Sequence, residues 1–270
     1  MSYLMNSAFG LSNYALVSFI MKIITPAQAM TKTVTKTIRK IAIKTVVKAP
    51  VRPAKTDRPD RKYDILLAAE KLFAQRGFSA VSIRDIANEA GVQLALVGYY
   101  YGQKKDLYHA IFEHWATVIN ERVQSLQQAV DAPSGDKLER VVTAFIEPVI
   151  RLRNSTEGEY YALLMSRGLS QQSSDDDAVI REFFDPLAKA FISALHKLLK
   201  AEFPGTTQGN VAWCYQFMLG CLLHHITDNR VVRLSNQKNQ SHGPEATPLL
   251  INFVVCGIRG ALTPRPAPKL

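Results

Sequence analysis

The sequence contains little cysteine and no long uninterrupted apolar run. Its three cysteines (Cys214, Cys221 and Cys256) are too few and too widely spaced for a disulfide framework or a cysteine-based zinc site, and they indicate a reducing cytoplasm. The most apolar early stretch, residues 14–24, is interrupted by a serine and a lysine and has no basic segment before it. We therefore expect neither a signal peptide nor stable membrane insertion.

Motifs for catalysis and cofactor binding are also missing. There is no P-loop, no glycine-rich dinucleotide turn and no supported arrangement of serine, histidine and aspartate. The pairs His109–His114 and His224–His225 do not have metal-site spacing. The sequence therefore predicts no enzyme, no cofactor and no metal.

The formal net charge of +10 is concentrated in one segment. Residues 31–62 carry eleven Lys or Arg and only two acidic residues, whereas from residue 63 onward 21 basic and 21 acidic residues cancel. Residues 1–58 are expected to form a basic, disordered N-terminal extension. Its cations would strengthen binding to DNA phosphates; alternatively, the segment only solubilises the chain or is absent from a product that starts later.

Strand signals are absent, and the rest of the chain has helical periodicity broken at polar, Gly- and Pro-rich segments. The fold class is therefore expected to be all-α. After three short helices between residues 60 and 101, long helices are predicted at about 103–130, 136–152, 157–171, 177–202, 210–233 and 245–261. Pro186 lies inside the fourth long helix and should kink it or move its start.

The three short helices are punctuated by glycine. The first, about 60–76, places Ile65, Leu72 and Phe73 on one face and ends at Gly77. The second is predicted to begin at Ser82, because Asp85 follows in the capping-box position. Gly91 makes the turn to the third helix. This arrangement is typical of a helix-turn-helix DNA-binding head.

The third helix has an unusual outward face. On a helical wheel that starts at Gln93, Leu94, Val97 and Tyr101 point inward, and the opposite side carries Ala95, Leu96 and Tyr99, with Gln93 and Tyr100 on one flank. Glutamine can pair with a base edge, small apolar groups can meet thymine methyls, and tyrosine hydroxyls can donate to phosphates. The alternative is that Tyr99 and Tyr100 are only half-buried aromatics.

Cations follow this helix directly. Lys104 and Lys105 lie in the first turn of the next helix, where the helix dipole disfavours positive charge, so an external DNA phosphate is a suitable partner. Long lysines in solvent are the alternative. Ser82 and Arg84, at the start of the second helix, are also placed to contact the DNA backbone.

From about residue 63 to 115 the chain resembles the TetR family of bacterial transcriptional regulators. The resemblance is carried by ILLAAEKLFAQRGF, SIRDIANEAGV and YYYGQKKDL in combination. It implies the following DNA-facing set, to which we add Lys105: Ser82, Arg84, Gln93, Ala95, Leu96, Tyr99, Tyr100 and Lys104. The sequence departs from the family pattern at Gln103, where serine usually caps the next helix, and at Gly98, where a larger residue is frequent.

The family resemblance also implies a homodimer formed by the last two long helices, and an effector pocket in the helical body. The candidate pocket residues, for each of which the sequence favours ordinary core over a ligand contact, are Phe145, Tyr160, Leu164, Phe183, Phe191, Trp213 and Phe217. No polar constellation singles out a chemical class of effector.

The predicted organisation is an N-terminal extension (1–58), a three-helix helix-turn-helix head (59–107), a larger helical effector-binding and dimerisation domain (108–262) and a tail (263–270). The predicted function is a cytoplasmic, homodimeric repressor that binds double-stranded DNA at a near-palindromic operator and is released by an unknown small molecule. The alternative is a membrane-surface or partner-binding scaffold that uses the basic arm.

Overall fold

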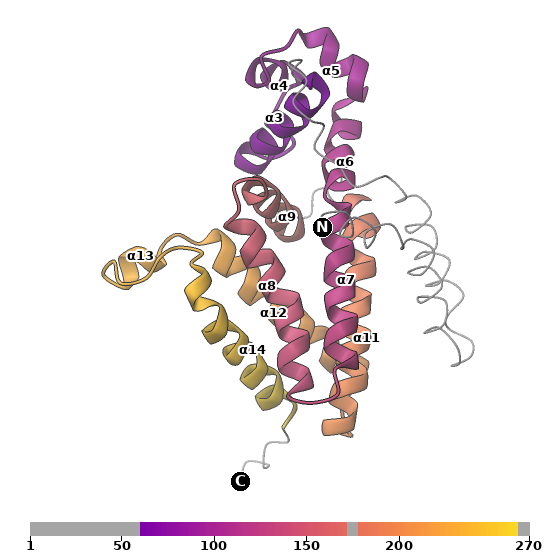
Figure 1. Ribbon diagram of the computed structural model, residues 1–270, viewed down its shortest axis with the longest axis vertical. Coiled ribbons are helices and arrows are strands. Elements are labelled where there is room, and N and C mark those ends of the chain that lie inside the picture. The colour runs from indigo at the N-terminus through magenta and orange to yellow at the C-terminus, as the bar shows by residue number, and fades with distance from the viewer. Residues whose placement is uncertain (1–59, 172–177, 264–270) are drawn as a thin grey trace, which may run out of the picture. The chain divides into compact units, whose positions relative to one another are not determined.

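The computed structural model describes residues 60–171 and 178–263, and their regular structure is helical (Figure 1). No strand occurs within these ranges, in agreement with the all-α prediction. The predicted basic extension and all but the first residue of the predicted tail lie outside them. All described residues belong to one unit, Val51–Leu270.

The three short helices of the head form as the sequence predicts. Helix α3 (Arg61–Arg76) begins at Asp60, whose side chain accepts from the Tyr63 amide, and ends at Gly77. Helix α4 (Ile83–Glu89) begins with the predicted capping box, and α5 (Leu94–Tyr101) follows the turn at Gly91. Gly91 has φ +62°, a left-handed conformation in which a side chain would be strained.

The helix predicted at 103–130 is two helices, and the prediction of one is wrong. Helix α6 (Lys104–His114) ends at Trp115, and α7 (Ala116–Asp131) begins directly after it. No proline or glycine marks this break. The backbone of Trp115 leaves helical geometry, with ψ 6°, where its indole contacts residues of α3 and α9.

The central helices follow the predicted pattern. Helices α8 (Lys137–Arg153) and α9 (Glu159–Gln171) lie within two residues of the predicted bounds at each end. The chain is helical from residue 178 to 202, so Pro186 does not move the start of the predicted helix; instead a π-helical turn, η1 (Ile180–Phe184), stands directly before α11 (Asp185–Glu202), whose first turn holds the proline.

The last predicted helices are shorter than expected or displaced. Helix α12 (Gln208–Thr227) stops six residues before the predicted end, and a separate turn, α13 (Val231–Leu234), follows it. A 3-10 turn, η2 (Pro244–Ala246), leads into α14 (Thr247–Leu262).

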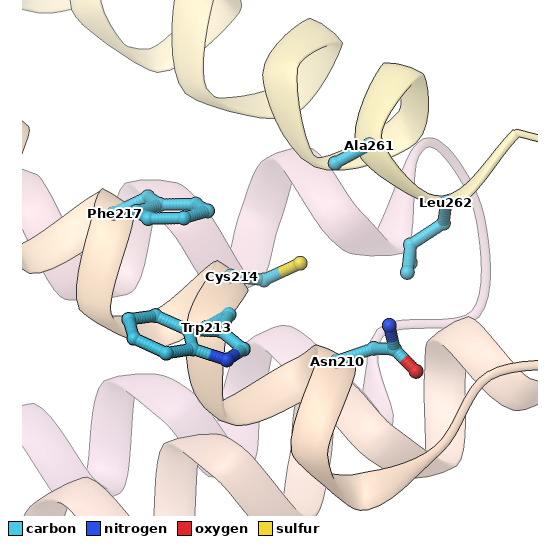
Figure 2. Close-up of a pocket in the computed structure, with 6 residues that line it drawn as sticks. All are labelled: Asn210, Trp213, Cys214, Phe217, Ala261 and Leu262. Atoms are coloured by element: carbon cyan, nitrogen blue, oxygen red, sulfur yellow. The ribbon is translucent and has the colours of Figure 1, made fainter.

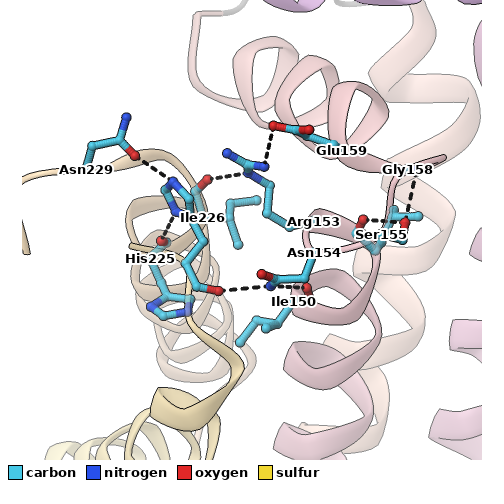
Figure 3. Close-up of polar contacts among 11 residues, drawn as sticks. Ile150, Arg153, Asn154, Ser155, Gly158, Glu159, His225, Ile226 and Asn229 are labelled. Carbon is cyan, nitrogen blue, oxygen red and sulfur yellow. Dashed lines mark hydrogen bonds and ion pairs between the residues drawn. The ribbon is translucent and has the colours of Figure 1, made fainter. Parts of the chain in front are cut away.

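The connection between α12 and α14 is held against the end of α8. Figure 3 shows Arg153 donating to the Ile226 carbonyl at 3.1 Å and pairing with Glu159 at 3.0 Å. The Asn154 amide donates to the His242 carbonyl at 2.9 Å, and the His242 ring contacts the carbonyl of His225 and the side chain of Asn229. Buried carbonyls at this crossing therefore have partners, which stabilises the irregular segment.

Helix α8 forms the centre of the body, because it contacts α7, α9, α11, α12 and α14. Its fully buried residues include Val141, Phe145 and Ile146. The head joins this body through contacts of α3 with α9 and α6. A displacement of α9 or α6 would therefore shift α3 of the head directly.

Candidate nucleic-acid interface

Helix α5 presents large side chains to solvent. Tyr99 is 81% exposed and Leu94 is 47% exposed, and the rings of Tyr99 and Tyr100 meet edge-on with centroids 5.2 Å apart. Gln93, Ala95 and Gly98 are exposed beside them. Exposed aromatic and aliphatic groups gathered on one short helix indicate a binding surface.

The inner face of α5 differs from the helical-wheel prediction at two positions. Val97 is buried, and the Tyr101 hydroxyl donates to the Lys62 carbonyl at 2.8 Å, as an inward position requires. Leu94, however, points outward, and Leu96 is half-buried against the core. Leu94 is the first residue of the helix and therefore lies at the edge of the packing surface, where sequence reasoning overlooked it as a surface residue.

The start of α4 lies in an ordered capping box. The Ser82 hydroxyl donates to the Asp85 carboxylate at 2.6 Å and accepts from the Asp85 amide at 3.1 Å. These bonds lower the pKa of Asp85 and keep it charged. The Ser82 hydroxyl is therefore already used to cap α4, whereas Arg84, two residues later, is exposed. The predicted DNA contacts of both residues stay predictions.

The two lysines after α5 are in different surroundings. The Lys104 ammonium donates to the carbonyls of Phe78 and Val81, at 2.8 and 2.9 Å, and lies 4.2 Å from the centre of the Phe78 ring. Two of the three N–H groups of the Lys104 ammonium thus donate to carbonyls of the head, and one N–H is left for the predicted phosphate contact. Lys105 is exposed. At Gln103, the Asp106 carboxylate accepts from the backbone amide at 3.0 Å and so caps α6 without the serine that is usual in the family.

The head meets the body at a buried carboxylate. Glu70 of α3 is 2% exposed and accepts a hydrogen bond from the Trp115 indole at 2.8 Å. Burial raises the pKa of Glu70 to about 7, although the bond from Trp115 opposes this shift. The protonation of Glu70 is therefore sensitive to pH near neutrality. Sequence reasoning missed this residue, since a single glutamate on a helix gives no signal of burial.

The predicted effector residues lie in three different surroundings. Phe145, Leu164 and Phe191 are buried, and the rings of Phe145 and Phe191 meet edge to face at 5.0 Å. Tyr160 and Phe183 are half-buried. Trp213 and Phe217 are 63% and 59% exposed, so they do not share one interior with the buried group. An effector role for any of these residues stays a prediction.

Trp213 and Phe217 instead line an open surface groove. Their rings stack at 5.8 Å, and Asn210, Cys214, Ala261 and Leu262 complete a groove of about 330 Å³ (Figure 2). The neighbouring α14 exposes Leu249 and Phe253. The two helices that the sequence assigns to the dimer interface thus carry the exposed apolar surface that such an interface requires.

In the described part of the chain, no group of three or more His, Cys, Asp or Glu side chains is arranged to hold a metal ion. One described stretch, Pro244–Leu262, is long and apolar enough to cross a membrane by length and composition, with a mean hydropathy of 1.3. The predicted absence of membrane insertion stays a prediction.

Two family models match the segments described above. The model "Bacterial regulatory proteins, tetR family" matches residues 65–111, and "Tetracyclin repressor-like, C-terminal domain" matches residues 143–257. Together they span more than half of the chain. The chain belongs to the TetR family. This membership does not favour the scaffold alternative, and it places the chain in a family of regulators rather than of enzymes.

Individual relatives agree with the TetR assignment. The chain is 37% identical over 91 residues to the HTH-type transcriptional repressor Rv3405c of Mycobacterium tuberculosis, which is 34% of this chain and 45% of that protein. It is 29% identical over 144 residues to the regulator BetI of Brucella anthropi, covering 53% and 72% of the two chains. The chain thus matches about half the length of the first of these relatives.

Solved structures share the TetR fold. AmtR of Mycobacterium smegmatis is 20% identical and has a TM-score of 0.50, with 80% of this chain and 91% of that chain covered. A HlyIIR mutant protein is 19% identical with a TM-score of 0.51, covering 76% and 98%.

Proposed function

We propose that this protein is a DNA-binding transcriptional regulator that inserts α5 into the major groove. The observation that carries the proposal is the exposed face of α5, with Tyr99, Tyr100 and Gln93, and the exposed cations Arg84 of α4 and Lys105 of α6. Polar and apolar groups on such a helix read base edges, while exposed cations of the neighbouring helices α4 and α6 bind phosphates.

The active form in this proposal is a homodimer. The exposed apolar faces of α12 and α14 pair with the same faces of a second copy, which removes Trp213, Phe217 and Phe253 from water. A two-fold dimer carries two α5 helices, so its operator is near-palindromic, with half-sites about one DNA turn or a multiple of it apart. Such a protein acts in the cytoplasm, where bacterial DNA is.

We further propose that the protein is a repressor released by a small molecule. The relative from Mycobacterium tuberculosis is named a repressor, and the helical body is large enough to bury an effector. Release requires that the effector bind better to a conformation whose heads no longer fit the two half-sites.

The test is selection of binding sites by the full chain from random DNA, followed by footprinting of the selected sites and of the promoter upstream of its own gene. The expected result is one sequence motif with two symmetric half-sites that survives excess random competitor DNA at physiological salt. If random competitor DNA displaces the selected DNA completely, then charge alone binds the DNA and the proposal is wrong.

A further inference from the structure

The body contains a buried cation that has no acidic partner among the described residues. Arg122 of α7 is 5% exposed, and within the described residues no carboxylate lies within 4 Å of its guanidinium. Its Nη2 donates to the Phe145 carbonyl at 3.3 Å, and its Nε has no hydrogen-bond partner. A buried charge is normally paired, because its desolvation costs several kcal/mol.

Aromatic groups surround this guanidinium in place of an anion. The Phe145 ring lies 5.1 Å from it, and Tyr215 of α12 packs edge-on against that ring at 5.5 Å. The face of an aromatic ring is a weak substitute for a carboxylate. The guanidinium is thus buried among aromatic side chains that supply little of the negative charge it needs.

A second unsatisfied group lies near the same cation. The hydroxyl of Tyr161, on α9, is fully buried and has no hydrogen-bond partner. Arg122 interacts electrostatically with Tyr161 and with Tyr215, which opposes the rise that burial causes in the pKa of each phenol. A free guanidinium N–H and a free phenol O–H from two helices are the donors that one carboxylate would accept.

The same tyrosine is connected to the DNA-binding head. Its ring stacks on Trp115, with centroids 5.0 Å apart and 15° between the planes. Trp115 in turn donates to Glu70 of α3. A shift of Tyr161 therefore acts on the junction of α6 and α7 and on the first helix of the head.

We propose that Arg122 and Tyr161 form the anion-binding end of the effector site, and that the effector is a small molecule with a carboxylate on an apolar skeleton. The carboxylate takes the unpaired guanidinium N–H and the phenol O–H, and the apolar skeleton displaces the aromatic contact of Phe145. Binding pulls on Tyr161 and, through Trp115 and Glu70, moves α3. Only this last, regulatory step rests on the proposed function.

Binding is tested on the full chain without DNA. The probes are carboxylic acids, each paired with the neutral amide of the same shape: benzoate with benzamide, phenylacetate with phenylacetamide, and octanoate with octanamide. The readouts are the Tm and the emission of Trp115 in a Trp213→Phe background. At least one acid is expected to raise the Tm and change the emission, and its amide is not. A panel in which no acid exceeds its amide overturns the proposal.

Variants then test the two donors. Arg122→Met is expected to abolish the response to the acid without lowering the Tm of the free protein, because it removes an unpaired buried charge. Tyr161→Phe removes one hydroxyl and is expected to weaken acid binding about tenfold while the fold is kept. The control is Arg140→Met, since Arg140 donates to the carbonyls of Ala129, Ala132 and Ser134. It should lower the Tm and leave acid binding intact.

An acid response that persists in Arg122→Met and in Tyr161→Phe overturns the site, and so does a lower Tm in both variants without acid.

The regulatory step is measured last, as release of the selected operator DNA by the responding acid. Trp115→Phe should bind the acid but lose most of the release. A chain that binds acid but no DNA would refute the proposed function and leave the anion site standing, whereas DNA binding without acid binding would do the reverse.

Discussion

The indole N–H of Trp115 donates to the Glu70 carboxylate across 2.8 Å, at the junction between the DNA-binding head and the helical body. Trp115 stands in the break between α6 and α7, and Glu70 lies in the buried face of α3. One hydrogen bond thus connects the point where the long helix is interrupted with the core of the head. The burial of Glu70 makes the stability of the head depend on the ionisation of this carboxyl group.

The first prediction concerns the pH dependence of stability at Glu70. Burial raises its pKa from 4.5 to about 7, so the folded state binds a proton more tightly than the unfolded state does. The stability that protonated Glu70 contributes is fully present below pH 4.5 and is lost as the pH rises through about 7. Glu70→Gln should therefore match the natural chain near pH 4.5 and exceed its free energy of unfolding at pH 8, by roughly 3 kcal/mol.

The measurement is urea unfolding of both chains between pH 4.5 and pH 8. Glu147→Gln is the matched control, since Glu147 is exposed on α8. Comparing variants in pairs removes the contribution of other groups, such as His225, whose pKa is lowered by burial and by His242. A constant difference between Glu70→Gln and the natural chain across this range would contradict the prediction.

The second prediction separates Lys104 from Lys105. Lys104→Met loses charged hydrogen bonds to two carbonyls and the contact with the Phe78 ring, and it should lower the free energy of unfolding by about 2 kcal/mol. Lys105→Met should change stability by less than about 0.5 kcal/mol, because Lys105 is exposed. Its loss should instead reduce the salt dependence of operator binding by about one phosphate contact. Equal effects of the two substitutions on stability would refute this assignment.

The third prediction concerns the exposed ring of Tyr99. Tyr99→Ala should leave the Tm nearly unchanged, because the side chain is 81% exposed, and should weaken operator binding about tenfold or more. Tyr99→Phe separates loss of the hydroxyl from loss of the ring. Gln124→Ala, at an exposed position of α7, is the control. Unchanged affinity in Tyr99→Ala would exclude this face of α5 from the interface.

The fourth prediction concerns the dimer. Phe217→Glu places a charge in the stacked pair of Trp213 and Phe217 and should convert the dimer into a monomer, as measured by sedimentation at micromolar concentration. Operator affinity should fall with it, since one head then binds one half-site. Leu234→Glu is the control, because Leu234 is 71% exposed on α13, outside the two pairing helices. A dimer that survives Phe217→Glu would show that this face is not the interface.

Much of the head could be predicted from the sequence because its signals are local. Asp60 and Ser82 begin helices with their own side chains, and Gly77 and Gly91 take the backbone through positive φ. Each of these effects acts over four residues or fewer. The outward position of Tyr99 and the buried position of Val97 follow from the same short-range periodicity.

The tertiary structure alone decided the features that depend on distant partners. A helical period marks an apolar face but does not say whether that face meets the core or a second chain, so Phe145 and Phe217 read alike in the sequence although one is buried and the other exposed. The break at Trp115 and the carbonyl partners of Lys104 arise from residues 23 to 46 positions away. Helix periodicity specifies which residues share a face, whereas the packing of α7, α8, α9 and α12 buried Arg122 where no carboxylate of residues 60–171 or 178–263 pairs with it.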